Sequence, residues 1–149
     1  MSDQPGQLKP LPVDLVELCI ALENEARGFD WYLDVETGDT VLVNAEYEPH
    51  EYGGLKVEEI EGNPQRFRRV PSTDDRQALA DMEAFATQHR DERLRESLML
   101  ALEAPRPDRR FRAVLGWLPE EQQAWHQFRH QRLEARARAW LEQLGLQPE

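Results

Sequence analysis

Hydrophobic residues recur with two different periods in the first third of the chain. From Val13 to Ala26 they return every three or four positions, the spacing of one helix face, and Gly28 stands where that helix would end. From Phe29 to Val35 they alternate with polar residues, and residues 40–44 repeat the strand pattern after a turn that contains Gly38. The pattern predicts a helix followed by a β-hairpin. The apolar helix face comprises Leu15, Leu18, Cys19, Leu22 and Ala26.

The segment after the hairpin has no regular period. Residues 45–64 are acidic and interrupted by glycine and proline, which predicts a long loop with one helical turn around residues 57–60. A third strand is predicted from Gln65 to Val70, where Phe67 and Val70 are the apolar positions. Pro71 ends it.

From Ser72 the pattern is helical almost to the end of the chain. Ser72 or Thr73 is the expected cap of the first of four helices, and Asp91 begins the second. A short helix over residues 110–118 should let Trp117 close the core, and a long helix runs from Pro119 to Leu144. The predicted fold class is α+β: an N-terminal helix, a three-stranded antiparallel meander and a helical C-terminal half of about four helices. Residues 1–12 are predicted to be a flexible tail and residues 13–146 a single α+β domain.

Composition excludes several classes of protein. Hydrophobic residues make up 40% and charged residues 32% of the 149 residues, which is typical of a globular chain. No apolar run approaches the roughly 20 residues of a membrane helix, and the polar N-terminus does not resemble a signal peptide. A lone Cys19 on an apolar helix face indicates a buried small side chain and excludes an internal disulfide. We expect a cytoplasmic protein that does not bind membranes.

Negative charge is concentrated in the first part of the chain. The net charge is −11, and residues 1–62 hold 15 acidic residues against three basic ones, a net charge of −12. Residues 63–149 hold 14 acidic residues against 15 arginines, so that part is nearly neutral and rich in local arginine clusters.

Two arginine clusters are candidate partner-binding residues. The first surrounds Phe111, and the second follows one face of the long helix, because steps of 100° bring its members together with a tryptophan. Three interpretations remain open: pairing with the acidic first part of the same chain, which the net charge favours, binding of an acidic protein or a second copy, and binding of nucleic acid, the least favoured. The candidates are Arg109, Arg110 and Arg112 in the first cluster and Trp125, Arg129, Arg132 and Arg136 in the second.

Catalytic and metal signatures are weak. His126 and His130 stand four residues apart on a predicted helix and could hold a metal ion, but Gln127 occupies the position of the zinc-peptidase glutamate. No glycine-rich phosphate loop or nucleophile elbow is present, so no cofactor and no catalytic residue is assigned. The sequence favours a non-enzymatic interaction or regulatory module. The alternative is an enzyme with its site between the acidic strand face around Asp34 and the segment Arg109–Arg112.

Several short motifs together resemble a known family. They are Val13-Asp14-Leu15, Tyr32-Leu33-Asp34 before Glu36-Thr37-Gly38, Met82-Glu83-Ala84-Phe85, Arg109-Arg110-Phe111-Arg112, Trp125 with Phe128-Arg129, and Arg138-Ala139-Trp140-Leu141. The set resembles a family of small bacterial proteins, number 0158 in the uncharacterised protein family series, over about residues 13–146. That resemblance implies no activity.

Overall fold

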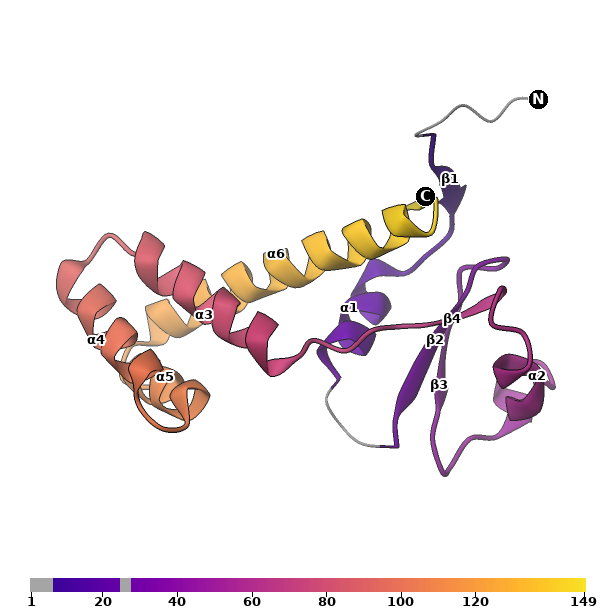
Figure 1. Cartoon of the computed structure of the whole chain (residues 1–149), viewed down its shortest axis with the longest axis horizontal. Helices are drawn as coiled ribbons and strands as arrows, with labels where there is room; N and C mark the ends of the chain where they lie inside the picture. The colour runs from indigo at the N-terminus through magenta and orange to yellow at the C-terminus, as the bar shows by residue number, and fades with distance from the viewer. Residues whose placement is uncertain (1–6, 25–27) are drawn as a thin grey trace. The chain divides into compact units, whose positions relative to one another are not determined.

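Short strands and short helices are mixed along the chain up to β4 (Phe67–Arg69), and four helices follow from residue 75 to residue 143. The computed structural model describes residues 7–24 and 28–149. The α+β class, with an N-terminal helix, a three-stranded antiparallel sheet and a helical C-terminal half, is confirmed (Figure 1). In chain order the elements are β1 (Lys9–Leu11), α1 (Leu15–Glu23), β2 (Asp30–Asp34), β3 (Thr40–Val43), the 3-10 helix η1 (Pro49–Tyr52), α2 (Val57–Glu61), β4 (Phe67–Arg69), α3 (Asp75–Gln88), α4 (Glu92–Glu103), α5 (Pro107–Leu115), α6 (Pro119–Gln143) and β5 (Leu146–Pro148).

These elements gather into two compact units. The sheet unit comprises residues 1–72 and 133–149, and the helical unit comprises residues 73–132. Each unit has hydrophobic clusters of its own, and α6 begins in the helical unit and ends in the sheet unit. The single domain over residues 13–146 therefore stays a prediction.

The three-stranded sheet is antiparallel, but its strand order is not that of a meander. The order is β3-β2-β4, so β2 is central and β4 pairs with it on the side opposite β3. The predicted meander is wrong in this detail because the long segment after β3 returns the chain to the free edge of β2. The same segment carries the predicted helical turn, α2, which places Ile60 in contact with Val41 and Phe67.

Both faces of this sheet are covered. Leu33 and the partly buried Trp31 pack on one side against a core that includes α1 and the end of α6. On the other side Val41 and Phe67 pack with Ile60, and partly buried tyrosines of the loop surround them. Figure 1 shows α1 and α2 on either side of the strands. The acidic positions of β2 therefore do not lie on an open solvent face.

A second, two-stranded sheet joins the two ends of the chain. β1 and β5 are parallel, with Lys9 opposite Leu146, and both Leu11 and Leu146 are buried in the core. Residues 9–11 are thus a strand instead of part of a flexible tail, because Leu11 finds a buried position there. Residues 1–6 of the predicted tail lie outside the described residues.

α1 forms where the sequence predicted it. Asp14 caps it by accepting hydrogen bonds from the backbone N–H groups of Val16 and Glu17. Leu18, Cys19 and Leu22 are buried as expected. Ala26, the last predicted member of that face, lies outside the described residues.

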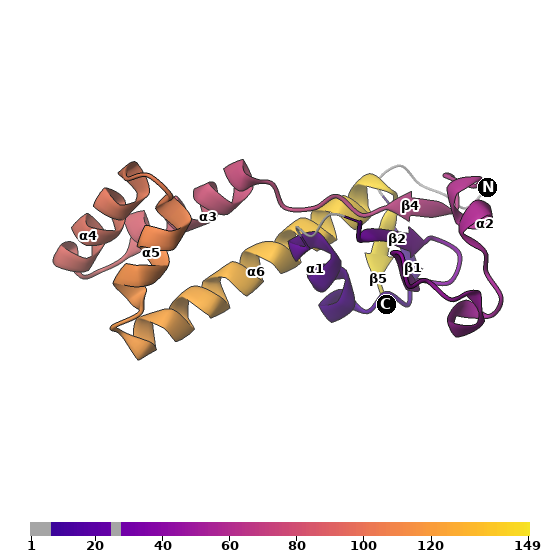
Figure 2. The same ribbon diagram turned by 90° about the horizontal axis from the view of Figure 1, so that it is seen from below.

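The helices of the helical unit enclose an aromatic core. Asp74 caps α3 in a capping box with Gln77, one residue after the predicted caps, because its carboxylate reaches the Gln77 N–H. Asp91 caps α4 as predicted. α5 begins at Pro107, three residues before the predicted start, and packs beside α4 (Figure 2). The buried core of the unit comprises Met82, Phe85, Ala86, Leu98, Phe111, Leu115 and Trp125.

Among the residues that the structure describes, no helix combines the length and the hydropathy that crossing a membrane requires.

Candidate functional site

The carboxylates of β2 pair with arginines from the neighbouring strand region. Arg66 forms two hydrogen bonds to Asp34, Nε to Oδ1 at 3.0 Å and Nη2 to Oδ2 at 2.9 Å, and its Nε also lies 2.8 Å from Glu36 Oε2. Arg69 pairs with Asp30 at 2.5 Å. The acidic residues of β2 thus pair with Arg66 and Arg69. Neither of these arginines belongs to the two predicted arginine clusters.

Asp34 is the most constrained of these carboxylates. Only 5% of its surface is exposed, and the backbone N–H groups of Glu36 and Thr37 donate to Oδ1 at 2.9 and 3.4 Å. Burial alone would raise the pKa of Asp34, but the hydrogen bonds from Arg66 and from the turn outweigh it and hold that pKa below its ordinary value of 3.8. Asp34 therefore stays ionised and fixes the turn that leads into β3.

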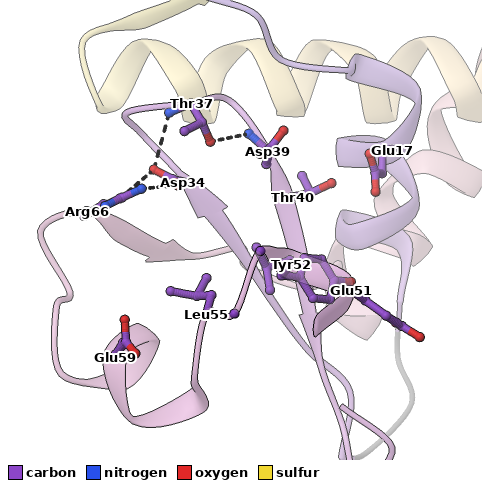
Figure 3. A pocket seen from close by; sticks show the side chains of 13 residues that line it. Glu17, Asp34, Thr37, Asp39, Thr40, Glu51, Tyr52, Leu55, Glu59 and Arg66 are labelled. Atoms are coloured by element: carbon purple, nitrogen blue, oxygen red, sulfur yellow. Dashed lines mark hydrogen bonds and ion pairs between the residues drawn. The ribbon is translucent and has the colours of Figure 1, made fainter. Parts of the chain in front are cut away.

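A pocket of about 680 Å³ opens beside this ion pair in the sheet unit. We call it the acidic pocket, because five carboxylates line it against one arginine, Arg66. Figure 3 shows Asp39 and Thr40 at the start of β3, Glu17 on α1 and Glu51 on η1 around it. Its lining residues are Glu17, Asp34, Thr37, Asp39, Thr40, Val41, Glu51, Tyr52, Gly53, Gly54, Leu55, Glu59 and Arg66.

Thr40 stands out within the acidic pocket. Only 6% of its surface is exposed, and its hydroxyl oxygen has no hydrogen-bond partner among the described residues. Figure 3 shows this side chain extending from β3 toward Glu17. A buried hydroxyl without a partner costs about 1–3 kcal/mol. The sequence pattern could not identify it, because a β-branched residue is ordinary at the start of a strand.

The predicted stripe on α6 is not an exposed surface. Trp125 is 5% exposed and packs edge-to-face against Phe85 and Phe111 in the core. Arg132 donates from Nε to Asp81 Oδ1 at 2.7 Å, within the helical unit. Arg129 and Arg136 are half-buried, and both have interaction partners. A tryptophan buried in the core cannot stack on a nucleic-acid base or contact a partner protein. The helical wheel therefore identified a face of α6 that packs inside the helical unit.

The first arginine cluster has the opposite character. Arg109, Arg110 and Arg112 are exposed on α5, as is Arg106 just before it. None of the four side chains forms an ion pair or hydrogen bond with any residue that the structure describes. Phe111 and Leu115 fill the inner side of α5, which leaves the arginines on its outer side. We call these four residues the arginine surface.

An exposed tryptophan follows the arginine surface. Trp117 is 87% exposed and the adjacent Leu118 is 38% exposed, so Trp117 does not close the core as predicted. Leu115 and Phe111 already fill that position. Tryptophan is enriched in protein interfaces relative to the rest of the surface.

His126 and His130 are both exposed on α6, where they line a shallow hollow with Pro119 and three glutamines. Three potential ligand atoms lie within 4.8 Å of one another at only one place in the described chain, the exposed group of Glu48, His50 and Glu51. The weak metal candidates His126 and His130 thus gain no third ligand from the described residues.

Comparison with known proteins agrees with the resemblance of the motifs. A family model described as "Uncharacterised protein family (UPF0158)" matches residues 8–149. The UPF0158 protein PA5073 of Pseudomonas aeruginosa is 30% identical over 141 residues, which cover 95% of this chain and 88% of that protein. No solved structure gives a significant match to the chain. The chain belongs to the uncharacterised protein family UPF0158.

Proposed function

We propose that this protein is a non-enzymatic interaction module that binds an acidic partner protein through the arginine surface of α5. The observation that carries the proposal is the set of four exposed arginines that have no ion pair among the described residues. Charges that a chain does not neutralise itself are available to a partner.

Trp117 supports a protein as the partner. Tryptophan and arginine are the residues most enriched at the energetic centres of protein interfaces, and here they lie within eleven residues of each other. A nucleic-acid binder would carry an overall positive charge, whereas this chain has a net charge of −11. The four arginines therefore attract an acidic patch more readily than a long polyanion.

The enzyme alternative has less support. It requires Asp34 to work with the arginines of α5, but Asp34 is hydrogen-bonded twice by Arg66. Its pKa is lowered, which makes it a poor general acid or base near neutral pH.

The test is partner recovery with the tagged full-length chain from nuclease-treated lysate of the source cells. The variant carries Arg109→Glu, Arg110→Glu and Arg112→Glu. We expect it to lose a specifically recovered acidic protein, and Trp117→Ala should lower the recovery at least severalfold. The recovered protein is then purified, and its binding to the chain is measured by fluorescence anisotropy across a salt series.

A second triple variant gives the matched control. Arg76, Arg90 and Arg93 are exposed in the same unit, and changing all three to Glu alters the net charge by the same amount. The control should retain binding within about twofold if the surface is specific. Equal loss in both variants, unchanged recovery with the α5 variant, or recovery only from a parallel lysate without nuclease treatment would each overturn the proposal.

A further inference from the structure

We propose that the acidic pocket of the sheet unit binds an aliphatic polyamine, an organic cation with two or more ammonium groups. The site lies in a different unit from the arginine surface, so this inference is independent of the proposed function.

The charge of the acidic pocket selects a cation. Of its five carboxylates, Asp34 is paired with Arg66, and Glu36 outside the lining also contacts that arginine. Arg66 is the single basic residue in the lining, so the lining carries a net charge of −4. Four carboxylates of the lining are not paired with Arg66: Glu17, Asp39, Glu51 and Glu59. A concave surface lined by one sign of charge concentrates counter-ions of the opposite sign.

Thr40 points to an ammonium group. An ammonium donates three hydrogen bonds and accepts none, so it needs three acceptors around one point. Figure 3 shows Thr40 extending toward Glu17, and Asp39, next to Thr40 in the chain, also lines the acidic pocket. The Thr40 oxygen has no hydrogen-bond partner in the described part of the chain and is closed to bulk water. Binding there requires a neighbouring side chain to move, and Glu17, which is half-buried on α1, lines the same pocket.

The spread of the carboxylates argues against a metal ion. A divalent cation collects its ligand atoms within about 2.0–2.6 Å of itself, so the ligands must converge on one point. The single convergent group among the described residues is Glu48, His50 and Glu51, which is exposed and shares only Glu51 with the acidic pocket. The carboxylates are instead spread over the lining of a pocket of about 680 Å³. This arrangement suits a ligand whose ammonium groups are separated by methylene segments.

Apolar side chains between the carboxylates suit the methylene segments of such a chain. Val41, Tyr52 and Leu55 line the acidic pocket together with the acids. Tyr52 is held in place by stacking on Tyr47, with ring centroids 5.3 Å apart, and the Tyr47 hydroxyl donates to the Leu55 carbonyl. A polyamine can thus place its ammonium groups at the acids and its methylenes on the partly exposed Tyr52 and Leu55.

The experiment is titration of the full-length protein with spermidine, followed by calorimetry and by NMR of the backbone amides at 0.15 M salt. Binding should shift the amides of Thr40 and its neighbours. The double variant Glu17→Gln, Asp39→Asn should weaken spermidine binding at least tenfold. n-Butylamine, which carries one ammonium group, should bind at least tenfold more weakly than spermidine to the native chain.

Thr40→Val separates binding from folding. Replacing an unpartnered buried hydroxyl with a methyl group leaves stability unchanged or raises it, because the unsatisfied oxygen disappears. The same change should weaken spermidine binding several-fold, since one ammonium acceptor is lost. Weaker binding in a variant that melts at or above the native temperature supports the site, whereas unchanged binding contradicts it.

The matched control is Glu46→Gln, Glu48→Gln. Both residues are exposed in the same acidic segment but do not line the acidic pocket. This pair changes the net charge as much as the test pair does, and it should alter the affinity less than twofold. Equal weakening by the two pairs, displacement of spermidine by stoichiometric Mg²⁺, or tighter binding of N-acetyl-lysine methylamide than of spermidine would each overturn the proposal.

Discussion

Replacing Arg66 with methionine isolates the contribution of the Asp34–Arg66 pair to the stability of the sheet unit. Methionine keeps an unbranched side chain but removes both hydrogen bonds to Asp34, of 3.0 and 2.9 Å. Asp34, which is 5% exposed, keeps its hydrogen bonds from Glu36 and Thr37. The change therefore leaves a buried carboxylate without its charged partner.

The expected loss follows from these contacts. Hydrogen bonds to charged groups contribute about 1.5–3 kcal/mol each, and removal of one partner from a buried pair costs about 3–5 kcal/mol. The Arg66 side chain is 37% exposed, so solvent screens the pair and lowers the value. We expect the free energy of unfolding to fall by about 2 kcal/mol, or the melting temperature by about 4–8 °C.

The assay is urea unfolding followed by circular dichroism, repeated from pH 7 to pH 3. In the native chain the pKa of Asp34 is lowered below its ordinary value of 3.8. The ionised carboxylate therefore stabilises the folded state fully above pH 3.8, and this contribution is lost as the pH falls through the lowered pKa. Without Arg66 the largest interaction that lowers this pKa is lost, so the pKa should lie higher than in the native chain. The difference between native and variant should therefore be largest near pH 7 and shrink below about pH 4.

Arg68→Met is the control, because Arg68 is exposed on β4 and forms no ion pair within the described part of the chain. It should change the free energy of unfolding by less than about 0.5 kcal/mol. The reasoning is refuted if the Arg66 and Arg68 variants are equally stable, or if the effect of Arg66→Met does not depend on pH.

Three further perturbations test the cores and the turn. Phe111→Ala removes a fully buried ring from the aromatic core and should cost about 3–5 kcal/mol in urea unfolding; a loss below 1 kcal/mol would contradict its central position. Gly38→Ala should lower the melting temperature, because the residue has a φ of +88° and a Cβ would lie 2.5 Å from the Pro12 carbonyl oxygen; an unchanged melt would disprove the close approach. Cys19 should react with iodoacetamide at pH 8 only after denaturation, since burial, with Glu134 and Glu23, raises the pKa of its thiol; rapid labelling of the folded chain would contradict this.

Local chemistry predicted most individual elements. The capping carboxylates of Asp14 and Asp91 act within one turn of their own helix, and Gly38 adopts the left-handed conformation that the turn needs. The alternation of β2 and the period of α1 likewise depend on near neighbours. Boundaries shifted by one to three residues where a nearby group competed, as at Asp74 and Pro107.

The candidate sites were predictable only in part. A helical wheel shows which residues share a face of a helix, but it does not show whether that face is buried. It placed Trp125 beside three arginines, but it could not tell that Phe85 and Phe111 would enclose the indole. The same method missed Trp117, whose exposure depends on core positions that other side chains already fill. Within α5, by contrast, Phe111 faces inward and its arginines outward, as the one-residue steps of a helix require.

Sequence alone determined the α+β class, the start of α4 at Asp91, the burial of Cys19 and the surplus of acid in the first 62 residues, because these depend on composition and short-range periodicity. Tertiary structure decided which groups meet across long separations. It placed β4 against β2 so that Arg66 reaches Asp34, and it paired β1 with β5. It also collected carboxylates from α1, η1 and the turn before β3 in one pocket with Thr40. The physical reason is that strand order and long-range pairing follow from how the whole apolar surface is buried, which no local pattern specifies.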